Sequence, residues 1–256
     1  MEIITKRGIN MRVLITGATG GIGKALIDIF YRNNWEILAI GRNQDILKEL
    51  KKKYKEKLNI YPVDLEDEKN IDKFFKEIEE QDINLLINGA GIGELGYFED
   101  ISYENEKKMI DINIIALIKF TKYFYGKIDG IINISSTAGF QYGGPLMSGY
   151  YATKSFVNSF TFGLMGEESK TKMMLLCPGP TLTNFKGMNK EIKGMEKFYI
   201  TTPEEVAKRC YFDYLRKRRV SIPGKINKIL YFFNKVIPIM PQLKAIKKVQ
   251  EKKIKK

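Results

Sequence analysis

A tyrosine and a lysine four residues apart, Tyr150 and Lys154, are the residues whose types and spacing could most readily do chemistry. Positions i and i+4 share one face of a helix, so the two side chains would point the same way. A phenol ordinarily loses its proton near pH ~10, and a neighbouring ammonium lowers that pKa by favouring the phenolate. Such a pair would exchange protons near neutrality, as alcohol–carbonyl chemistry requires.

The same spacing also fits the start of an ordinary amphipathic helix, so the surrounding residues decide between the two interpretations. Two serines, Ser135 and Ser136, precede a Gly-rich turn, and either could face the phenol. Tyr151 adjoins Tyr150, but the residue four positions after Tyr151 is Ser155. Only Tyr150 therefore has a lysine partner.

Several rival chemistries are excluded by composition. The 256-residue chain contains no histidine, which rules out a Ser-His-Asp triad, a His-ligated zinc site and a histidine base. We expect no bound metal. The two cysteines, Cys177 and Cys210, cannot form a disulfide framework. They fit a reducing compartment, and we expect a cytoplasmic protein.

Short apolar segments alternate with helical patterns along the chain. Seven segments are expected to be strands: Met11–Thr16, Trp35–Ile40, Leu58–Val63, Ile83–Asn88, Ile128–Ser135, Lys172–Cys177 and Arg219–Ile222. Tyr150 and Lys154 fall on a predicted helix, Ser148–Ser169. This alternation predicts one α/β domain with a doubly wound parallel sheet of about seven strands. Such sheets bind ligands at the carboxyl ends of their strands.

A glycine-rich turn, Thr16-Gly-Ala-Thr-Gly-Gly-Ile-Gly23, follows the first strand and opens the first helix. Glycines let the backbone approach a pyrophosphate, and the helix N-terminus supplies free N–H groups. A tight turn without a ligand is the alternative, but the position and the four glycines favour a nucleotide. The spacing fits T-G-x-x-x-G-x-G and also T-G-x-x-G-x-x-G. The expected cofactor contacts here are Gly17, Thr19, Gly20, Gly21, Ile22 and Gly23.

The second strand ends in Ile40-Gly41-Arg42-Asn43, without an acidic residue. An acid at this point would bind the adenosine ribose and favour NAD, whereas an arginine accommodates a 2′-phosphate. Arg42 therefore predicts NADP, and a surface arginine beside a helix is the alternative.

These motifs, in this order, resemble those of the short-chain dehydrogenase/reductase superfamily in its short single-domain branch, over roughly Arg12–Gly224. The resemblance implies a Rossmann-like fold and an NADP-dependent oxidoreductase that transfers a hydride between NADPH and a carbonyl or alcohol substrate. It also implies cofactor contacts beyond the glycine turn. These are Asp64 and Leu65, then Asn88, Ala90 and Gly91, and finally Pro178, Gly179, Thr181 and Thr183.

The resemblance assigns a catalytic tetrad to Asn113, Ser136, Tyr150 and Lys154. Tyr150 would exchange a proton with the substrate oxygen, to which Ser136 would donate a hydrogen bond. Lys154 would lower the pKa of Tyr150 and hold the nicotinamide ribose, so both residues would also contact the cofactor. Asn113 would hold a water that links Lys154 to solvent.

The chain departs from the family pattern in two places. Gly89 stands where the family usually has a second asparagine, and Ser136 and Tyr150 are separated by one residue more than is commonest. Gly143 and Gly144 offer room for that residue. The ambiguous glycine spacing also fits the extended branch of epimerases and dehydratases, although only about 75 residues follow Pro178. A non-catalytic NADP-binding sensor or scaffold is the other alternative.

The net charge of +13 resides in the C-terminal part of the chain. From Arg216 onward there are 14 Lys and Arg and one acid, Glu251, whereas residues 1–215 are neutral overall. We divide the chain into an N-terminal extension (1–10), the Rossmann-like domain (11–224) and a basic amphipathic extension (225–256).

The extension has a helical apolar face. Its members are Ile226, Ile229, Leu230, Phe233, Val236 and Ile237, with Lys228, Asn234 and Lys235 opposite. This face could pack on the body or on another subunit, or could lie peripherally at the inner face of a membrane. Nucleic acid is not an expected partner.

The expected partner is a small carbonyl or alcohol substrate, and the expected assembly is a homo-oligomer, either a dimer or a tetramer. We expect residues 184–200 to form a lid over the substrate. Its apolar side chains favour an apolar substrate; they are Phe185, Met188, Met195 and Phe198.

Overall fold

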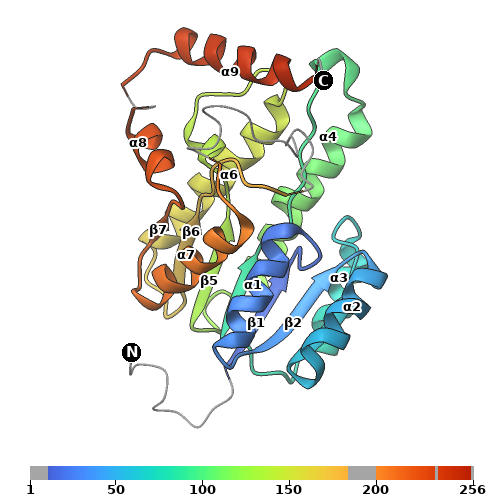
Figure 1. The fold of residues 1–256 in the computed structure, drawn as a ribbon. Helices are drawn as coiled ribbons and strands as arrows, with labels where there is room; N and C mark the ends of the chain where they lie inside the picture. Colours follow the sequence, from blue (N-terminus) through green and yellow to red (C-terminus); the bar gives the residue numbers. More distant parts are fainter. Residues whose placement is uncertain (1–10, 184–199, 234–235, 255–256) are drawn as a thin grey trace.

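The computed structural model describes residues 11–183, 200–233 and 236–254, and within these residues the strands form one seven-stranded sheet (Figure 1). The strands are β1 (Arg12–Thr16), β2 (Glu36–Gly41), β3 (Leu58–Pro62), β4 (Leu85–Asn88), β5 (Gly130–Ile134), β6 (Lys172–Leu176) and β7 (Val220–Ser221). Their order is β3-β2-β1-β4-β5-β6-β7, and every pairing is parallel. The predicted doubly wound sheet is confirmed. The strand order reverses between β1 and β4, which is where such sheets bind ligands.

Helices cover both faces of the sheet. They are α1 (Gly21–Arg32), α2 (Gln44–Tyr54), α3 (Glu68–Glu77), α4 (Tyr103–Ile110), α5 (Leu117–Phe124), α6 (Ser148–Gly166), α7 (Pro203–Leu215), α8 (Lys225–Phe233) and α9 (Ile239–Ile254). Successive strand residues point to opposite faces. Val13 and Ile15 of β1 therefore pack with α1, α2 and α7, whereas Leu14 packs with α3 and α5.

The sequence also predicts one long helix over Ser102–Tyr125, and in the structure this helix is interrupted in its middle. Between α4 and α5 the structure has a π-helical segment, Asp111–Ala116. A π-helical turn holds one more residue than an α-helical turn and often lies at a functional site. Here it carries Asn113, which is buried beneath the carboxyl end of β4.

The loop before α6 accommodates the additional residue between Ser136 and Tyr150. Leu146 adopts a left-handed backbone conformation with φ of 67°. The Gly144 carbonyl accepts a hydrogen bond from the Met147 N–H (2.9 Å), and the Leu146 carbonyl accepts one from the Gly96 N–H (2.9 Å). A side chain at Gly144 would overlap the ring of Tyr151, so this glycine allows the turn to pack closely on α6.

The C-terminal extension forms two helices whose boundary differs from the prediction. The predicted apolar helical face runs from Ile226 to Ile237, whereas α8 ends at Phe233, and Ile239, Met240 and Pro241 belong to α9. Proline is tolerated in a first helical turn because its missing N–H would have no helical partner there. Among the described residues, no helix is both long and apolar enough to cross a bilayer.

Candidate active site

The glycine-rich turn lies at the carboxyl end of β1 and leads into α1. Gly17 has φ of 71°, and a Cβ there would lie 2.8 Å from the Gly89 oxygen. A Cβ on Gly23 would overlap the Gly17 carbonyl oxygen. The Ala18 N–H donates to the Ile40 oxygen (2.9 Å), which fixes the turn on β2. The absence of side chains at these two positions lets the turn fold tightly and leaves its outer surface open.

That outer surface is one wall of a cavity of about 790 Å³. Most of the predicted cofactor contacts line it, namely Gly17, Thr19, Gly20, Gly21, Ile22, Gly23, Arg42, Leu65, Ala90, Gly91 and Thr183. They come from five separate parts of the chain, which the sheet brings to one edge. The cavity reaches from the N-terminus of α1 to Arg42 at the end of β2, as expected of a dinucleotide site.

Two predicted cofactor residues, Asp64 and Asn88, line neither this cavity nor the one that adjoins it. Asp64 is exposed, and its Oδ1 accepts a hydrogen bond from the Glu66 N–H (3.1 Å). Asn88 is buried, and its Nδ2 donates to Thr121 Oγ1 (3.0 Å) and Asn133 Oδ1 (2.9 Å). Asp64 thus caps a turn and Asn88 ties β4 to β5 and α5, so both support the site from outside the cavity.

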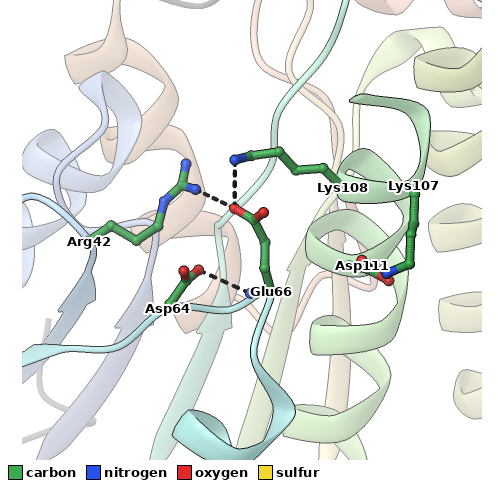
Figure 2. A network of polar contacts seen from close by, with 6 residues as sticks. All are labelled: Arg42, Asp64, Glu66, Lys107, Lys108 and Asp111. Atoms are coloured by element: carbon green, nitrogen blue, oxygen red, sulfur yellow. Dashed lines mark hydrogen bonds and ion pairs between the residues drawn. The ribbon is translucent and has the colours of Figure 1, made fainter. Parts of the chain in front are cut away.

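Arg42 takes part in an ion-pair network that the sequence did not reveal (Figure 2). Its guanidinium contacts Glu66 Oε1, and the Nζ of Lys108 lies 2.9 Å from the same oxygen. Arg42 and Lys108 both line the cavity, from β2's end and from α4. The neighbouring Lys107 instead pairs with Asp111 (2.6 Å), away from Glu66. One carboxylate therefore holds two cations together at the cavity wall.

A second cavity of about 480 Å³ adjoins the first. The two share the lining residues Ile22, Gly89, Gly91 and Thr183, so they meet at the glycine turn. The predicted residues that line the second cavity are Ile22, Gly91, Ser136, Tyr150, Lys154, Pro178, Gly179, Thr181 and Thr183. The structure thus brings three of the four predicted catalytic side chains to one cavity, beside the turn.

Tyr150 forms a hydrogen bond with Ser136, and burial has the largest effect on the pKa of Tyr150. Burial raises the pKa of Tyr150 to about 12, although the Ser136 hydrogen bond opposes that increase. The predicted lowering of this pKa by Lys154 is not seen in the structure. The ammonium lies 5.8 Å from the centre of the Tyr150 ring, and desolvation of the phenolate outweighs it. Tyr150 therefore carries its proton at neutral pH.

Lys154 is almost fully buried beside Tyr150. Its Nζ donates to the Ile134 carbonyl (3.1 Å), at the end of β5. Burial lowers the pKa of Lys154 to about 8, and the nearby Cys177 opposes that decrease. Burial also raises the pKa of the Cys177 thiol. This thiol therefore stays protonated and is a poor nucleophile. A lysine with this pKa changes charge close to neutrality.

Asn113 lies behind Lys154 and fastens two segments together. Its Oδ1 accepts from the Ile92 N–H (2.9 Å), and its Nδ2 donates to the Ile92 carbonyl (2.9 Å) and to Thr153 Oγ1 (3.0 Å). Thr153 adjoins Lys154 on α6, and a Cβ on Gly91 would lie 3.3 Å from Lys154 Nζ. Asn113 thus positions α6 and the loop after β4 relative to each other.

The two alternative candidates, Ser135 and Tyr151, also line the second cavity, but they have other partners. Ser135 is buried, and its hydroxyl donates to the Lys154 carbonyl (3.0 Å). Tyr151 packs with Ala138 and Met147, and burial raises its pKa while a hydrogen bond with Gln250 opposes that shift. Ser135 and Tyr151 are therefore structural neighbours of the Ser136–Tyr150 pair.

Sequence reasoning missed the contribution of the C-terminal helices to this site. Eight of their residues line the second cavity: Asn227, Leu230, Tyr231, Ala245, Ile246, Val249, Gln250 and Lys253. Their only signal in the sequence is a few polar residues within an otherwise apolar and basic segment. The predicted lid, with Phe185, Met188, Met195 and Phe198, lies outside the described residues.

The sequence profile of the short chain dehydrogenase family matches residues 11–194, a range that includes β1 to β6. This chain belongs to the short chain dehydrogenase family. The match contains the glycine turn and the three catalytic candidates that line the second cavity.

Two curated members of the family align with most of the chain. The NADP-dependent 3-hydroxy acid dehydrogenase YdfG of Escherichia coli O6:H1 is 32% identical over 221 residues, which is 79% of this chain and 88% of the relative. The 7beta-hydroxysteroid dehydrogenase of Mediterraneibacter gnavus is 29% identical over 234 residues, or 84% and 86% of the two chains.

Solved structures of short chain dehydrogenases share the fold. A short-chain dehydrogenase from Sphingobium yanoikuyae in complex with NADPH superposes with a TM-score of 0.75 and 23% identity, and the match covers 90% of this chain and 97% of that one.

Proposed function

We propose that this short chain dehydrogenase is an NADP-dependent oxidoreductase that interconverts a carbonyl group and an alcohol. The observation that carries the proposal is the meeting of Ser136, Tyr150 and Lys154 at a cavity that joins the glycine turn. The NADP dependence of the E. coli relative and the NADPH in the S. yanoikuyae structure support the choice of cofactor.

The first cavity fits a dinucleotide. The close approach of Gly17 to Gly89, and of Gly23 to Gly17, keeps side chains out of the space above the N-terminus of α1. We infer that the turn and the α1 N-terminus bind the pyrophosphate. Leu65 and Ala90 would flank the adenosine, and Thr181 and Thr183 the nicotinamide end. When bound, NADPH supplies the hydride.

Tyr150 supplies the proton for reduction. Its raised pKa keeps the phenol protonated at neutral pH, so it can donate a proton to a carbonyl oxygen as that oxygen gains charge. Ser136 already hydrogen-bonds Tyr150, and a substrate oxygen between the two hydroxyls would accept from both. The alcohol forms when the carbonyl carbon has gained a hydride and the oxygen this proton.

Lys154 stabilises Tyr150 after the phenol has lost that proton. A protonated Lys154 near the phenolate stabilises the negative charge that Tyr150 acquires after donating. Its pKa of about 8 means that the ammonium can also release its proton and thereby help to return one to Tyr150. Asn113 is a positioning residue, because it contacts Thr153 and Ile92 rather than the cavity.

Arg42 and Lys108 are the groups that would distinguish NADP from NAD. Both are cations at the cavity wall near the end of β2, where the adenosine 2′-phosphate is expected. In this structure the carboxylate of Glu66 forms ion pairs with both cations. A dianionic phosphate would compete with that carboxylate for the same two cations.

The substrate cavity favours a molecule with an apolar body. Its walls near Tyr150 include Met147, Tyr231 and Ile246, while Gln141 and Gln250 add polar groups. The names of the relatives refer to a 3-hydroxy acid and a 7beta-hydroxysteroid, which both carry a hydroxyl group. In the steroid, C7 is a ring carbon, so that alcohol is secondary. We propose that this chain acts on a secondary alcohol or the corresponding ketone. A homo-oligomer and a cytoplasmic location stay predictions.

A panel of carbonyl compounds tests the proposal. NADPH oxidation by the full chain would be followed with 3-oxo acids, oxosteroids and long-chain ketones and aldehydes. We expect turnover with at least one apolar ketone, and weaker activity when NADH replaces NADPH. Tight NADPH binding without turnover of any compound would favour the non-catalytic alternative.

A further inference from the structure

The α8 helix buries the polar residue Asn227, whereas most of its large apolar residues are exposed. Asn227 is only 2% exposed, and its Nδ2 donates to the Pro223 carbonyl (3.0 Å). Tyr231, one turn later, packs edge-on against Phe140 with ring centres 4.5 Å apart. On the opposite side Phe232 is 68% exposed and Phe233 51%. A helix packed only on its own domain would show the reverse pattern.

The same arrangement continues into α9. Gln242 and Gln250 are buried, and Ile246 packs against the Ala138–Met147–Tyr151 cluster. The residues around the junction of α8 and α9 are exposed and apolar. This apolar corner consists of Ile229, Phe232, Phe233, Val236, Ile237, Ile239 and Met240. It lies where α8 meets α9, away from the sheet (Figure 1).

Lysines border the apolar corner. Lys225 and Lys228 lie on the exposed side of α8, and the outer face of α9 carries a basic row. This row consists of Lys244, Lys247, Lys248 and Lys252, all exposed. The only acid of residues 225–256 is Glu251, which is 3.8 Å from Lys247. An apolar surface surrounded by unbalanced positive charge is complementary to an anionic lipid surface.

We propose that the apolar corner and the basic row dock the chain on an anionic membrane surface. The phenylalanines and the neighbouring aliphatic side chains would enter the boundary between headgroups and acyl chains, while the lysines contact lipid phosphates. Such docking needs no membrane-spanning helix.

A second copy of the chain fits this surface less well. A two-fold dimer places the same patch on both subunits. The basic row of one subunit would then approach the basic row of its partner, and like charges across an interface oppose association. Lipid phosphates carry the opposite charge and meet the row without this repulsion.

Membrane docking also bears on the substrate, and this part rests on the proposed function. The helices whose outer faces would contact lipid are the helices whose inner faces line the cavity beside Tyr150, through Tyr231, Ile246 and Gln250. An apolar ketone dissolved in the bilayer would thus be concentrated at the wall of the cavity that accepts it.

Vesicle flotation of the full chain tests the docking without any need for turnover. Phosphatidylcholine vesicles with and without phosphatidylglycerol would be compared at low and high salt. We expect flotation only with the anionic vesicles, and about tenfold less bound protein at high salt. The double variant Phe232→Ser/Phe233→Ser should lose at least tenfold in binding, and so should Lys244→Gln/Lys248→Gln.

Two matched control variants replace an exposed phenylalanine and two exposed lysines that lie outside the apolar corner and the basic row. Phe98 is an exposed phenylalanine far along the chain from the corner, and Lys48 and Lys52 are exposed lysines of α2. Phe98→Ser and Lys48→Gln/Lys52→Gln should float like the wild type. No flotation of the wild type at low salt would overturn the proposal, and so would equal losses in the corner variants and the controls. A vesicle-free dimer that the corner variant abolishes would assign the corner to a second copy instead.

A second assay separates this proposal from the proposed function. Phe232→Ser/Phe233→Ser should reduce a water-soluble ketone at the wild-type rate but should reduce a long-chain ketone in anionic vesicles at least tenfold more slowly. If the double variant reduced the vesicle-borne ketone at the wild-type rate, the proposed delivery of substrate from the membrane would be overturned. Absence of all turnover would count against the proposed function alone, because flotation would still report docking.

Discussion

The ammonium of Lys154 lies 5.8 Å from the centre of the Tyr150 ring, and both residues line the same cavity. Burial acts on the two groups in opposite directions, because it disfavours the charged form of each. The pKa of Tyr150 is raised to about 12, and the pKa of Lys154 is lowered to about 8. The lysine is therefore the member of the pair whose charge changes within the working range of most enzymes.

The buried ammonium should leave a signature in the pH dependence of stability. The folded chain gives up the Lys154 proton near pH 8 and the unfolded chain near pH 10.5, so between these values only the unfolded chain holds it. Stability then rises with pH across this window. Compared with Lys154→Met, the wild type should gain about 1 kcal/mol per pH unit between pH 8 and pH 10.

Urea unfolding of both proteins from pH 7 to pH 10 measures this difference. Tyr150 titrates in both proteins and cancels. Lys48→Met, which removes an exposed lysine of α2, should follow the wild-type curve. If the free energies of unfolding of the wild type and Lys154→Met changed with pH in parallel, Lys154 would have an ordinary pKa in the folded chain.

Arg42 and Lys108 should together determine the preference for NADPH. Each cation removed leaves the 2′-phosphate with one charge-assisted partner fewer, so Arg42→Ala and Lys108→Met should each raise the dissociation constant for NADPH by roughly tenfold. Binding of NADH, which lacks that phosphate, should change little. Fluorescence titration with both dinucleotides measures the two constants.

The neighbours of this pair supply the controls. Lys107→Met removes an adjacent cation that faces Asp111, so it should leave both constants unchanged. Glu66→Gln keeps the shape but removes the competing carboxylate, so it should tighten NADPH binding. Equal losses for NADPH and NADH in Arg42→Ala would argue against a phosphate role.

Gly23→Ala should damage the glycine turn. Its added methyl would overlap the Gly17 carbonyl oxygen, and backbone cannot move aside as a flexible side chain can. Overpacking of this kind costs about 1–3 kcal/mol. Thermal unfolding should therefore show a lower midpoint, with a loss of NADPH binding.

Gly163→Ala is the matched substitution on α6. A Cβ there meets no atom within 4 Å, so the variant should be more stable by about 0.5–1 kcal/mol because alanine favours a helix over glycine. An unchanged midpoint and unchanged NADPH binding in Gly23→Ala would contradict the packing of the turn.

Asn113→Leu should destabilise the chain, because Asn113 joins α6 to the loop after β4. The substitution leaves the Ile92 N–H and carbonyl and the Thr153 hydroxyl without the partner they have now. The expected loss of stability is about 2–4 kcal/mol. Thr153→Val removes one of these contacts and should lose about half as much. A stability for Asn113→Leu equal to that of the wild type would show that these contacts contribute little.

The sequence predicted the sheet well because each strand is a short apolar run that stops at a polar or glycine-rich turn. The structure moves the predicted ends of the strands by no more than two residues. The glycine turn and the Tyr150–Lys154 pair could also be predicted, since their spacing is local. The preference for Ser136 over Ser135 agrees with the geometry, in which Ser135 is bonded to the Lys154 carbonyl.

Other features depend on contacts between distant residues. Nothing in the sequence around Asn113 marks a π-helical turn, which is held by a loop 21 positions away. Lys108 reaches Arg42 only because α4 lies beside the end of β2. The extension was expected to bury its apolar face or to keep it for a membrane. The sequence did not show that Asn227 and Gln250 would be buried positions of the extension, where they bond to polar groups of the domain.

The Tyr150→Phe variant tests the central claim most directly, because it removes one hydroxyl and keeps the ring that fills the cavity. Rapid mixing with NADPH and the best ketone of the panel would measure reduction in a single turnover, and fluorescence titration would measure NADPH binding. The proposed role of Tyr150 predicts a rate at least about 100-fold lower and an NADPH dissociation constant close to the wild-type value. A reduction rate equal to that of the wild type would contradict it.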